Sequence, residues 1–549
     1  MFALELINKT KRIMCGILAT FGKADATYVS QQSALMAHRG PDERGMVETS
    51  LGILCHERLS IVDTATGRQP INGTRNCYVV HNGEIFNHVQ LHAETLKGKY
   101  KCHTTSDSEV IIHMYEEFGI DFCNMLDGFY AFAIIDEDKK KFMVARDPIG
   151  IKPLYYGTDK NGTMWFASEM KSLCDACVDI NVFPPGHYYT PETGFVKFYI
   201  PKWETATADD FDASDLRDYL ERSVDKRLMC DVPFGVLLSG GLDSSLIAAI
   251  TARKLKEQGK QLHSFSIGLT ADAPDLIAAR QVAEFIGTIH HEVHFTVEEG
   301  IAAAEKLVYN LESYDITTLR ASTPMFLLGK YIRDKGFKMV LSGEGADEVF
   351  GGYLYFYNAP TLEEFQEETK RRVRLLHTAD VLRADKSMMA SSIEVREPML
   401  DKYLLDKAIG LHPSLKMPIK PGVIEKGRIE KYVLRAAFDD AENPYLPHHI
   451  LWRQKEQFSD GVGYNWIDGF KAYCEAQVSD EQFSKAAAMY PHHTPETKEA
   501  FFIREKFASY FTHPQAETTV SKWIPKWQKS SDPSGRANEL HEAATQVLS

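Results

Sequence analysis

The seven residues 239 to 245, with the glycine- and serine-rich sequence SGGLDSS, could hold a phosphate group. The apolar run 235 to 238 predicts a buried strand before them, and the apolar residues from Leu246 to Ile250 predict a helix after them. A strand that leads through a glycine-rich turn into a helix gathers backbone N–H groups and the positive helix end around one point. We therefore expect an anion site here. It is not a Walker A loop, because that loop needs a Lys after its second Gly.

A second turn, residues 342 to 353 with the sequence SGEGADEVFGGY, carries three carboxylates in a short space. Such carboxylates repel one another unless a cation or a cationic substrate lies among them. Positive charge for phosphate chemistry could come from Arg320, in the stretch 317 to 320, and from Lys455. A solvated acidic turn and a solvated Lys are the alternatives that these residues leave open when each is considered alone.

Cys15 directly follows Met14 and is a candidate nucleophile. Once the Met is removed, the α-amine of the Cys itself can act as general base. Its pKa near ~8 lies close to ~8.5 for a thiol, so proton exchange between the two groups is nearly thermoneutral. The alternative is a buried Cys that opens a first strand.

The helices and strands that must position these groups are predicted from the spacing of apolar residues and from turn-forming Gly and Pro residues. Residues 78 to 199 read mainly as strands, with helices near 88 to 97 and 107 to 118, and the aperiodic acidic stretch 201 to 212 is the predicted linker. After residue 239, strands at 262–269, 290–295 and 337–341 alternate with helices near 275–287, 297–313 and 323–335. This alternation predicts a doubly wound parallel sheet, in which ligands sit at the carboxyl ends of the strands.

Overall composition is that of an ordinary globular protein of two to four domains. The 549 residues are 44% hydrophobic and 25% charged, with a formal net charge of −14, which argues against a nucleic-acid surface. Nine cysteines without disulfide-rich spacing point to the reducing cytoplasm. No apolar run is long enough to span a bilayer, so we expect no membrane partner. From the acidic charge we expect no nucleic-acid partner, and a homodimer is left open.

The SGGLDSS stretch resembles the pyrophosphate loop of the ATP pyrophosphatases, and RQKEQFSDG at 453–461 resembles the catalytic lysine segment of that family. The resemblance implies that ATP is cut between its α and β phosphates. It assigns the loop to pyrophosphate, Asp243 and Asp347 to Mg²⁺, and Lys455 to the α phosphate; Glu344 would accept a proton from attacking ammonia beside the acyl-adenylate. The implied ATP contacts are Leu238, Ser239, Gly240, Gly241, Asp243, Ser244, Ser245, Ile267, Ser342 and Gly343, and Thr317 and Arg320 would contact the substrate or intermediate.

The first 200 residues resemble a class II glutamine amidotransferase domain of the N-terminal-nucleophile type, with helices and antiparallel sheets stacked in layers. The motifs that carry the resemblance are HRGPD at 38–42, HERLSIVD at 56–63, HNGEIFN at 81–87 and TSDSE at 105–109. It implies that Cys15 attacks the glutamine amide, with Asn82 and the N–H of Gly83 as oxyanion hole. It also implies that Arg58 binds the α-carboxylate and Asp107 the α-ammonium of glutamine, with Glu84, Ile61 and Val62 lining the pocket.

Over nearly its whole length the chain resembles the glutamine-hydrolysing asparagine synthetases of the bacterial B type. The resemblance implies the cofactors ATP and Mg²⁺ and the substrates glutamine and aspartate. Aspartate and ATP would give β-aspartyl-AMP and pyrophosphate, and ammonia would then reach the intermediate through an internal apolar passage. The alternatives are a β-lactam synthetase, an ammonia-only synthetase and a non-enzymatic glutamine-sensing or storage protein.

The chain divides, on these expectations, into an extension or pro-segment (1–14), the amidotransferase domain (15–205), the synthetase domain (206–530) and a polar tail (531–549). The extension matters because it blocks the amine that Cys15 needs. An internal start at Met14 is the favoured explanation. Glu397, in the stretch EVREPMLD, stands where an uncharged residue is more usual in the family, and no physical reason for it is evident from sequence.

Overall fold

The structure is a computed structural model that describes residues 15–40, 42–205, 207–208, 210–420, 427–456, 458–463 and 465–528. The predicted extension (1–14) and polar tail (531–549) lie outside the described residues. Among the helices that are described, each is too short or too polar to cross a lipid bilayer.

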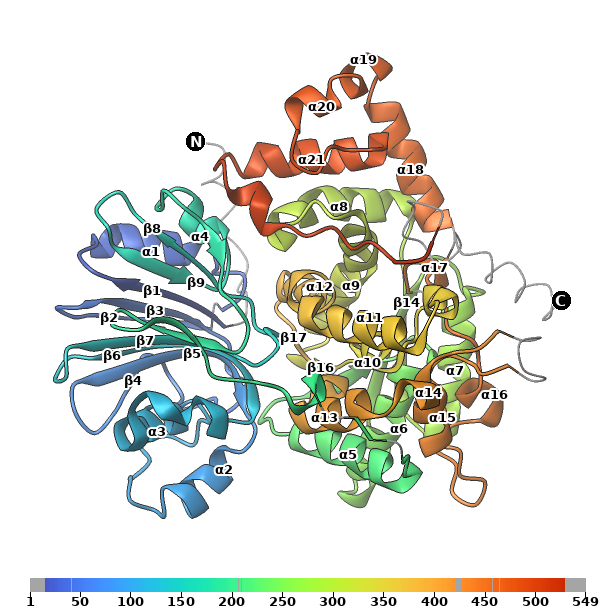
Figure 1. Cartoon of the computed structure of the whole chain (residues 1–549), viewed down its shortest axis with the longest axis horizontal. Coiled ribbons are helices and arrows are strands. Elements are labelled where there is room, and N and C mark those ends of the chain that lie inside the picture. Colours follow the sequence, from blue (N-terminus) through green and yellow to red (C-terminus); the bar gives the residue numbers. More distant parts are fainter. Residues whose placement is uncertain are drawn as a thin grey trace.

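Two six-stranded antiparallel sheets, stacked face to face, form the first part of the chain (Figure 1). The first sheet has the order β10 (Asn181–Val182), β8 (Tyr155–Thr158), β9 (Met164–Ala167), β1 (Gly16–Phe21), β3 (Gly52–Arg58) and β2 (Glu43–Glu48). The second has the order β12 (Gly194–Lys197), β11 (His187–Thr190), β7 (Lys141–Arg146), β6 (Gly128–Asp136), β5 (Cys77–Ile85) and β4 (Ile71–Asn72).

Strand alternation explains why these sheets form layers. In β6, Ala131 and Ala133 point into the core between the two sheets, whereas Tyr130 and Phe132 point to the opposite face. Helix α3 (Glu109–Phe118) covers that outer face of the second sheet, and α1 (Ala26–Ala34) covers the outer face of the first. The expected αββα arrangement is confirmed (Figure 1).

A five-stranded parallel sheet organises the second part of the chain. Its order is β15 (Ile289–His294), β14 (His263–Gly268), β13 (Phe234–Leu237), β16 (Met339–Leu341) and β17 (Glu394–Arg396). β13, the first of these five strands in the sequence, thus lies in the middle, and the order reverses between β13 and β16. That reversal is the topological switch point at which ligands bind in doubly wound sheets.

Helices cover both faces of this sheet, as the alternation of segments predicted. Side chains of α6 (Leu242–Glu257) and α7 (Pro274–Ile286) pack with Val236 and Leu341 on one face. Side chains of α8 (Val297–Leu311), α9 (Ile316–Asp334) and α12 (Asp380–Met389) pack with Phe265 and Val340 on the other. Further helices are α2 (His88–Gln90), α4 (Lys171–Cys174), α5 (Ala213–Lys226), α10 (Ala346–Phe350), α11 (Leu362–Leu375), α13 (Lys402–Gly410), α14 (Pro413–Lys416), α15 (Tyr432–Ala437), α16 (His448–Leu451), α17 (Phe458–Gly461), α18 (Asn465–Gln477), α19 (Asp480–Phe483), α20 (Ala486–Met489) and α21 (Lys498–Tyr510).

One helix boundary was predicted wrongly. The helix expected near 323–335 is α9, which begins at Ile316 and contains Pro324 in its interior. Pro324 has no N–H for the carbonyl of Arg320, one turn earlier, and this is why a Pro normally marks a helix start. Here the indole Nε1 of Trp466 donates to that carbonyl at 3.0 Å, so the chain stays helical through the proline.

A buried ionic cluster joins the two parts of the molecule. The Glu312 carboxylate accepts hydrogen bonds from the backbone N–H groups of Met170 and Lys171, at 2.8 and 2.7 Å. It also pairs with the ammonium groups of Lys171 and Lys386. Since all of its partners are buried with it, removal of the carboxylate would leave the Lys386 ammonium without its anion and Lys171 with Glu169 alone.

We expect Glu312→Ala to destabilise the protein by about 3–5 kcal/mol, because a buried charge cluster loses its central anion. The measurement is the urea midpoint of unfolding followed by tryptophan fluorescence. Asp225→Ala is the matched control: this carboxylate pairs with Lys254 at 3.7 Å, and its side chain is 61% exposed. The free energy of unfolding should change by no more than ~1 kcal/mol in this control variant. Equal effects of the two substitutions would contradict the role of Glu312 as the central anion of the cluster.

Candidate functional site

The loop 239–245 connects β13 to α6 at the switch point. The hydroxyl of Ser244 accepts a hydrogen bond from the backbone N–H of Ser239 at 3.1 Å and lies 3.0 Å from the Ser239 hydroxyl. Gly241 precedes the helix without a side-chain cap, so the first N–H groups of α6 have no side-chain acceptor. Those N–H groups suit a phosphate oxygen.

Two glycines permit the close approach of strand ends at this loop. Gly240 has a φ of +74°, and a Cβ on it would lie 2.5 Å from the backbone nitrogen of Ala279. A Cβ on Gly343, which follows β16, would lie 2.6 Å from the backbone nitrogen of Ser244. Any larger residue at 343 would push the acidic turn away from the loop.

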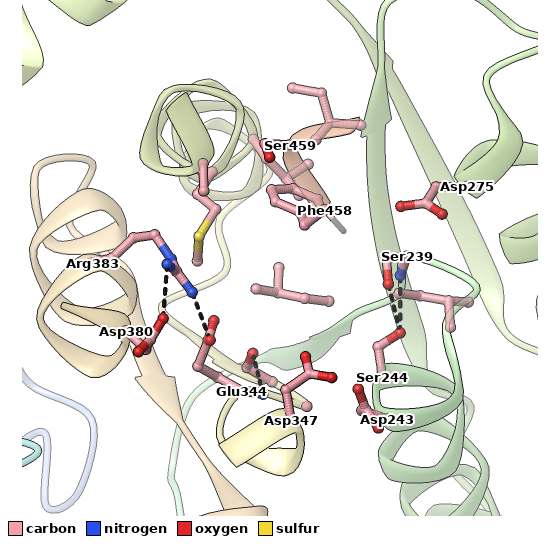
Figure 2. A pocket seen from close by; sticks show the side chains of 18 of the residues that line it. Ser239, Asp243, Ser244, Asp275, Glu344, Asp347, Asp380, Arg383, Phe458 and Ser459 are labelled. Carbon is pink, nitrogen blue, oxygen red and sulfur yellow. Dashed lines mark hydrogen bonds and ion pairs between the residues drawn. The ribbon is translucent and has the colours of Figure 1, made fainter. Parts of the chain in front are cut away.

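A cavity opens between these strand ends, and Figure 2 shows some of the side chains that line it. Its walls combine apolar groups, such as Phe265 and Met325, with polar groups at the loop. Of the residues predicted to form the ATP and aspartate site, those that line it are Leu238, Ser239, Asp243, Ser244, Ile267, Thr317, Ser342, Gly343, Glu344, Asp347 and Lys455. A smaller adjoining cavity includes Gly241, whereas Gly240, Ser245 and Arg320 line neither.

Asp243 and Asp347 face a common cationic centre. The Lys431 ammonium pairs with both carboxylates, at 2.6 Å from Asp347, and the Lys455 ammonium lies 2.8 Å from Asp347. Burial alone would raise the pKa of Asp347, but these two lysines outweigh it and lower that pKa to about 2. The pKa of Lys455 is raised in turn, because the two aspartates outweigh its own burial. The Asp347 carboxylate is therefore ionised at neutral pH.

Glu344 occupies a different electrostatic environment from Asp347. Its carboxylate pairs with Arg383 at 2.7 Å, and Arg383 also pairs with Asp380 at 3.1 Å (Figure 2). Burial raises the pKa of Glu344, Arg383 opposes this, and the carboxylates of Asp380 and Asp347 add to the rise. A carboxylate with a raised pKa is better suited to accept a proton than an ordinary one.

Arg320 does not lie where the sequence suggested. The segment 317–320 forms the first turn of α9 instead of preceding a helix, and Asp315 caps this helix by accepting from the N–H of Thr318 at 2.8 Å. An acidic cap leaves little attraction for an anion at this helix end. The Arg320 guanidinium is buried against Glu499 at 2.6 Å, whereas Thr317 lines the cavity with a buried hydroxyl that has no hydrogen-bond partner.

The candidate nucleophile Cys15 lies immediately before β1. Its Sγ accepts a hydrogen bond from the N–H of Leu59 at 3.2 Å, and its carbonyl accepts from Nε of Arg39 at 3.0 Å. Burial raises the pKa of the thiol to about 12, against the hydrogen bond to Leu59, and the carboxylates of Glu394 and Glu84 add to the rise. A thiol in this state needs a base close by in order to react.

The predicted oxyanion residues lie on β5, beside β1. The hydroxyl of Ser168 connects the two strands, since it accepts from the N–H of Ile17 at 3.0 Å and from Nδ2 of Asn82 at 3.5 Å. Gly83 follows Asn82 and pairs with Tyr130 of β6. The sequence separation of these groups is large, and the sheets bring them to one end of the sandwich.

The predicted glutamine contacts gather around the same end. Arg58 ends β3 next to Leu59 and pairs with Glu43 at 2.6 Å. Ile61, Val62 and Cys15 pack in one apolar cluster. The carbonyl of Ile61 accepts from the N–H of Asp231 at 2.9 Å, which holds this segment against the second part of the molecule.

Two buried carboxylates, Glu84 and Asp107, lack sufficient positive charge. Glu84 pairs with Arg396 of β17 at 2.8 Å, and Asp107 accepts from the N–H of Ile85 at 2.7 Å. Burial raises the pKa of both carboxyls, and the nearby carboxylate of Glu394 adds to each rise. An added cation, such as an α-ammonium group, would relieve this repulsion.

Several residues at these sites carried no recognisable sequence signal. Lys431 lies between two helices with no motif around it, and only the need for a cation near two carboxylates could have suggested one. Arg396 lies in the stretch EVREPMLD and Arg383 lies outside the motifs described above, and nothing in the sequence gave either residue a role. Asp275 also lines both cavities, and burial raises its pKa to about 7 despite Arg453 at 3.4 Å.

Glu397 has a physical account that the sequence did not supply. It directly follows β17, is 1% exposed, and its Oε2 has no hydrogen-bond partner. Burial raises its pKa to about 8; the Lys152 ammonium opposes this, and the carboxylates of Asp385 and Glu344 add to it. At neutral pH the group is therefore largely a neutral acid between the two parts of the molecule.

We expect Glu397→Gln to remove a pH dependence of stability. Between about pH 4.5 and pH 8 the folded chain keeps a proton that the unfolded chain has released, so the free energy of unfolding falls as pH rises through this window. The total fall from this group is on the order of 4 kcal/mol. Urea midpoints measured at pH 5, 7 and 9 should show that the stability of the variant, relative to that of the unsubstituted protein, increases toward pH 9. Glu481→Gln, at a side chain 83% exposed, is the control and should leave the profile unchanged; parallel profiles for Glu397→Gln would refute the account.

Comparison with known proteins agrees with this arrangement. A family model described as a glutamine amidotransferase domain matches residues 14–192, and one described as asparagine synthase matches 215–368 and 358–531. The chain is 50% identical over 560 residues to an asparagine synthetase [glutamine-hydrolyzing] from Asparagus officinalis, covering 97% of this chain and 94% of the relative. For asparagine synthetase [glutamine-hydrolyzing] 1 from Arabidopsis thaliana the identity is 49%, with 95% and 93% covered, and for a probable asparagine synthetase from Dictyostelium discoideum it is 47%, with 97% and 100% covered. The chain therefore belongs to the glutamine-hydrolysing asparagine synthetases.

Proposed function

We propose that this protein amidates aspartate with ammonia taken from glutamine, using ATP, and releases asparagine, glutamate, AMP and pyrophosphate. The observation that carries the proposal is the lysine-neutralised pair Asp243 and Asp347 beside a pyrophosphate-type loop, in a chain that also holds Cys15 at the start of β1. Curated relatives of this name match almost the whole chain. The β-lactam, ammonia-only and non-enzymatic alternatives have no comparable support.

In the amidotransferase part, the Cys15 thiolate attacks the side-chain amide carbon of glutamine, and ammonia leaves as a thioester forms. Asn82 and the N–H of Gly83 stabilise the oxyanion, at roughly 3–4 kcal/mol per donor. Arg58 binds the α-carboxylate, Asp107 and Glu84 receive the α-ammonium, and Ile61 and Val62 line the pocket. Water then hydrolyses the thioester to glutamate.

The base for this attack is the α-amine of Cys15, so we propose that residues 1–14 are absent from the active enzyme. The functional units are then residues 15–205 and 206–530, with 531–549 as a tail. The amidotransferase family model begins at residue 14, which supports this division.

In the synthetase part, an oxygen of the aspartate β-carboxylate attacks the α phosphorus of ATP, and the α–β phosphoanhydride bond breaks. Leu238, Ile267, Ser342 and Gly343 contact the adenosine. Ser239, Gly240, Gly241, Ser244 and Ser245 belong to the loop that receives pyrophosphate. Lys455 and Lys431 stabilise the charge that develops on the departing group, and the free hydroxyl of Thr317 is available to the substrate.

The donor set at the loop suits Mg²⁺. Asp243 and Asp347 are hard oxygen ligands in the first turns of α6 and α10, and the buried Oδ1 of Asp243 has no hydrogen-bond partner. When bound, the ion would neutralise phosphate charge. Lys431 lies between the same carboxylates, so the residues that would hold the ion are the ones that hold this ammonium.

The second half-reaction needs ammonia near Glu344. Its nitrogen attacks the acyl carbon of β-aspartyl-AMP, AMP leaves, and Glu344 accepts the proton. One apolar cluster includes both Cys15 and Leu400, and Leu400 packs against Gly345 beside Glu344. We propose that ammonia crosses along this cluster. The compartment we propose is the cytoplasm, since all nine cysteines are free thiols.

The nucleotide product tests the proposed reaction. Incubation with aspartate, glutamine, ATP and Mg²⁺ should give AMP, pyrophosphate and asparagine in equal amounts, measured by chromatography and mass spectrometry. ADP in place of AMP would overturn the adenylation step. AMP without asparagine would overturn aspartate as the substrate.

The role of Cys15 is tested by substitution. Cys15→Ala should lower glutamine-dependent synthesis by at least about a thousandfold, because the nucleophile is lost. Ammonia-dependent synthesis should remain, since the adenylating site shares no residue with the thiol. Cys174→Ala, another partly buried thiol, should affect neither rate.

Loss of both activities in Cys15→Ala would contradict independent sites. Intact mass of a glutaminase-active sample gives a second check on the same chemistry. A mass that includes residues 1–14 in such a sample would contradict the free amine as base.

A further inference from the structure

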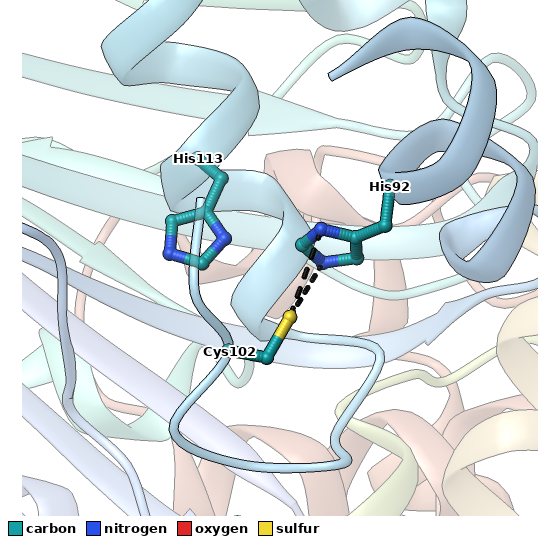
Figure 3. A group of neighbouring side chains, drawn as sticks. All are labelled: His92, Cys102 and His113. Atoms are coloured by element: carbon teal, nitrogen blue, oxygen red, sulfur yellow. Dashed lines mark hydrogen bonds between the residues drawn. The ribbon is translucent and has the colours of Figure 1, made fainter. Parts of the chain in front are cut away.

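Three potential metal ligands converge in the amidotransferase part, away from both sites described above. They are His92, on the π-helical turn Leu91–Thr95, Cys102, in the loop before α3, and His113, on α3 (Figure 3). One ligand atom from each lies within 4.8 Å of the others, and Sγ of Cys102 lies 3.6 Å from Nε2 of His92. None of the three belongs to the predicted glutamine or ATP site.

The distance between Cys102 and His92 matches the spacing of two ligands around zinc. Zn–S bonds near ~2.3 Å and Zn–N bonds near ~2.0 Å at a tetrahedral angle separate the sulfur and nitrogen by about 3.6 Å. Sγ of Cys102 is also 3.7 Å from Nδ1 of His92, so a rotation of this imidazole decides which nitrogen faces the ion. A Cys and two His ligands form a set that zinc accepts, with a fourth position for water or a carboxylate.

His113 supplies an independent reason to expect a ligand. Its side chain is 1% exposed, yet neither ring nitrogen has a hydrogen-bond partner. Its imidazole stacks on Tyr100, at 4.9 Å between ring centroids, and meets the His92 ring edge-on at 5.4 Å. A buried polar group left without a partner destabilises the folded chain, and an ion bound to one nitrogen would offset this cost.

Glu109 is placed to support the site. Its Oε1 lies 3.8 Å from Nε2 of His113, one helical turn away on α3. The same carboxylate accepts from the backbone N–H groups of His103 and Thr104, both at 2.8 Å. It thus connects the helix that bears His113 with the loop that bears Cys102, as carboxylates beside metal-bound His commonly do.

We propose that His92, the Cys102 thiolate and His113 bind one Zn²⁺ ion, with the fourth position open to water or Glu109. Cys102 is exposed, so the ion enters from solvent, and its thiol proton is released to water on binding. The ion joins the 91–95 turn, the loop and α3. Since the loop continues directly into 105–107, it also fixes the backbone that carries Asp107, one of the predicted glutamine contacts.

The test uses full-length protein, stripped with a chelator, kept reduced, and saturated with Mg²⁺ to occupy the Asp243 and Asp347 carboxylates. Zn²⁺ titration should give one equivalent and raise the melting temperature. Co²⁺ in its place should give the near-ultraviolet charge-transfer band of a thiolate ligand together with tetrahedral visible bands. Cys102→Ser should lose the band and weaken binding at least about 100-fold, since loss of an outer-shell partner alone costs 10- to 100-fold.

Two control variants separate this site from other thiols. Cys15→Ala and Cys174→Ser should keep the band and the affinity, because these side chains lie elsewhere. A band that survives in Cys102→Ser, or disappears in Cys15→Ala, would overturn the proposal. The absence of a one-equivalent Zn²⁺ complex in the unsubstituted protein would also overturn the proposal, because the exposed Cys102 is accessible to added Zn²⁺.

Discussion

The structure depends on the contact between the ends of β13 and β16. Gly343 leaves no room for a Cβ against the first turn of α6, so the acidic turn and the pyrophosphate-type loop approach to backbone contact. This contact brings Asp243 and Asp347 into reach of one ammonium group. A carboxylate pair this close is stable only with a cation among its partners, and Lys431 and Lys455 supply that charge. The order of the strands therefore dictates where a phosphate-handling site can form.

The second constraint is that the two sites share a wall. Arg396 of the parallel sheet pairs with Glu84 of the antiparallel sandwich, and Arg39 connects the carbonyl of Cys15 with Asp385 on α12. Side chains of the second part thus support the predicted glutamine site, whereas the residues that line the cavity at the parallel sheet all come from that second part. Glu397 belongs to the same wall, where its raised pKa keeps it largely uncharged among ions that are otherwise paired. A neutral acid here avoids the cost that a further unpaired charge would bring.

The fold was predictable because its signals are local. Alternating apolar residues indicated the antiparallel strands, and strand–helix alternation indicated the parallel sheet. The loop at 239–245 and the acidic turn were found because glycines and carboxylates cluster within a few residues. The start of α9 was placed too late, near Pro324, because a proline normally opens a helix, whereas Trp466, distant in sequence, satisfies the carbonyl that Pro324 leaves free. The sequence did not predict the roles of Lys431, Arg396 or the group His92, Cys102 and His113 for a similar reason. Each role depends on contacts between separate segments of the chain, and residue spacing does not show such contacts.

The burial of Cys15 limits how its chemistry can begin. With the pKa of the thiol raised to about 12, the thiol form of Cys15 predominates strongly at pH 7. Arg58 lies near enough to oppose this rise, but it is engaged with Glu43 and does not overcome the burial. A free α-amine on Cys15 would act in both of its forms, because the ammonium form stabilises a neighbouring thiolate and the amine form accepts its proton. A peptide bond to Met14 removes both forms at once. The buried thiol is therefore a physical reason for our proposal that the active enzyme begins at Cys15.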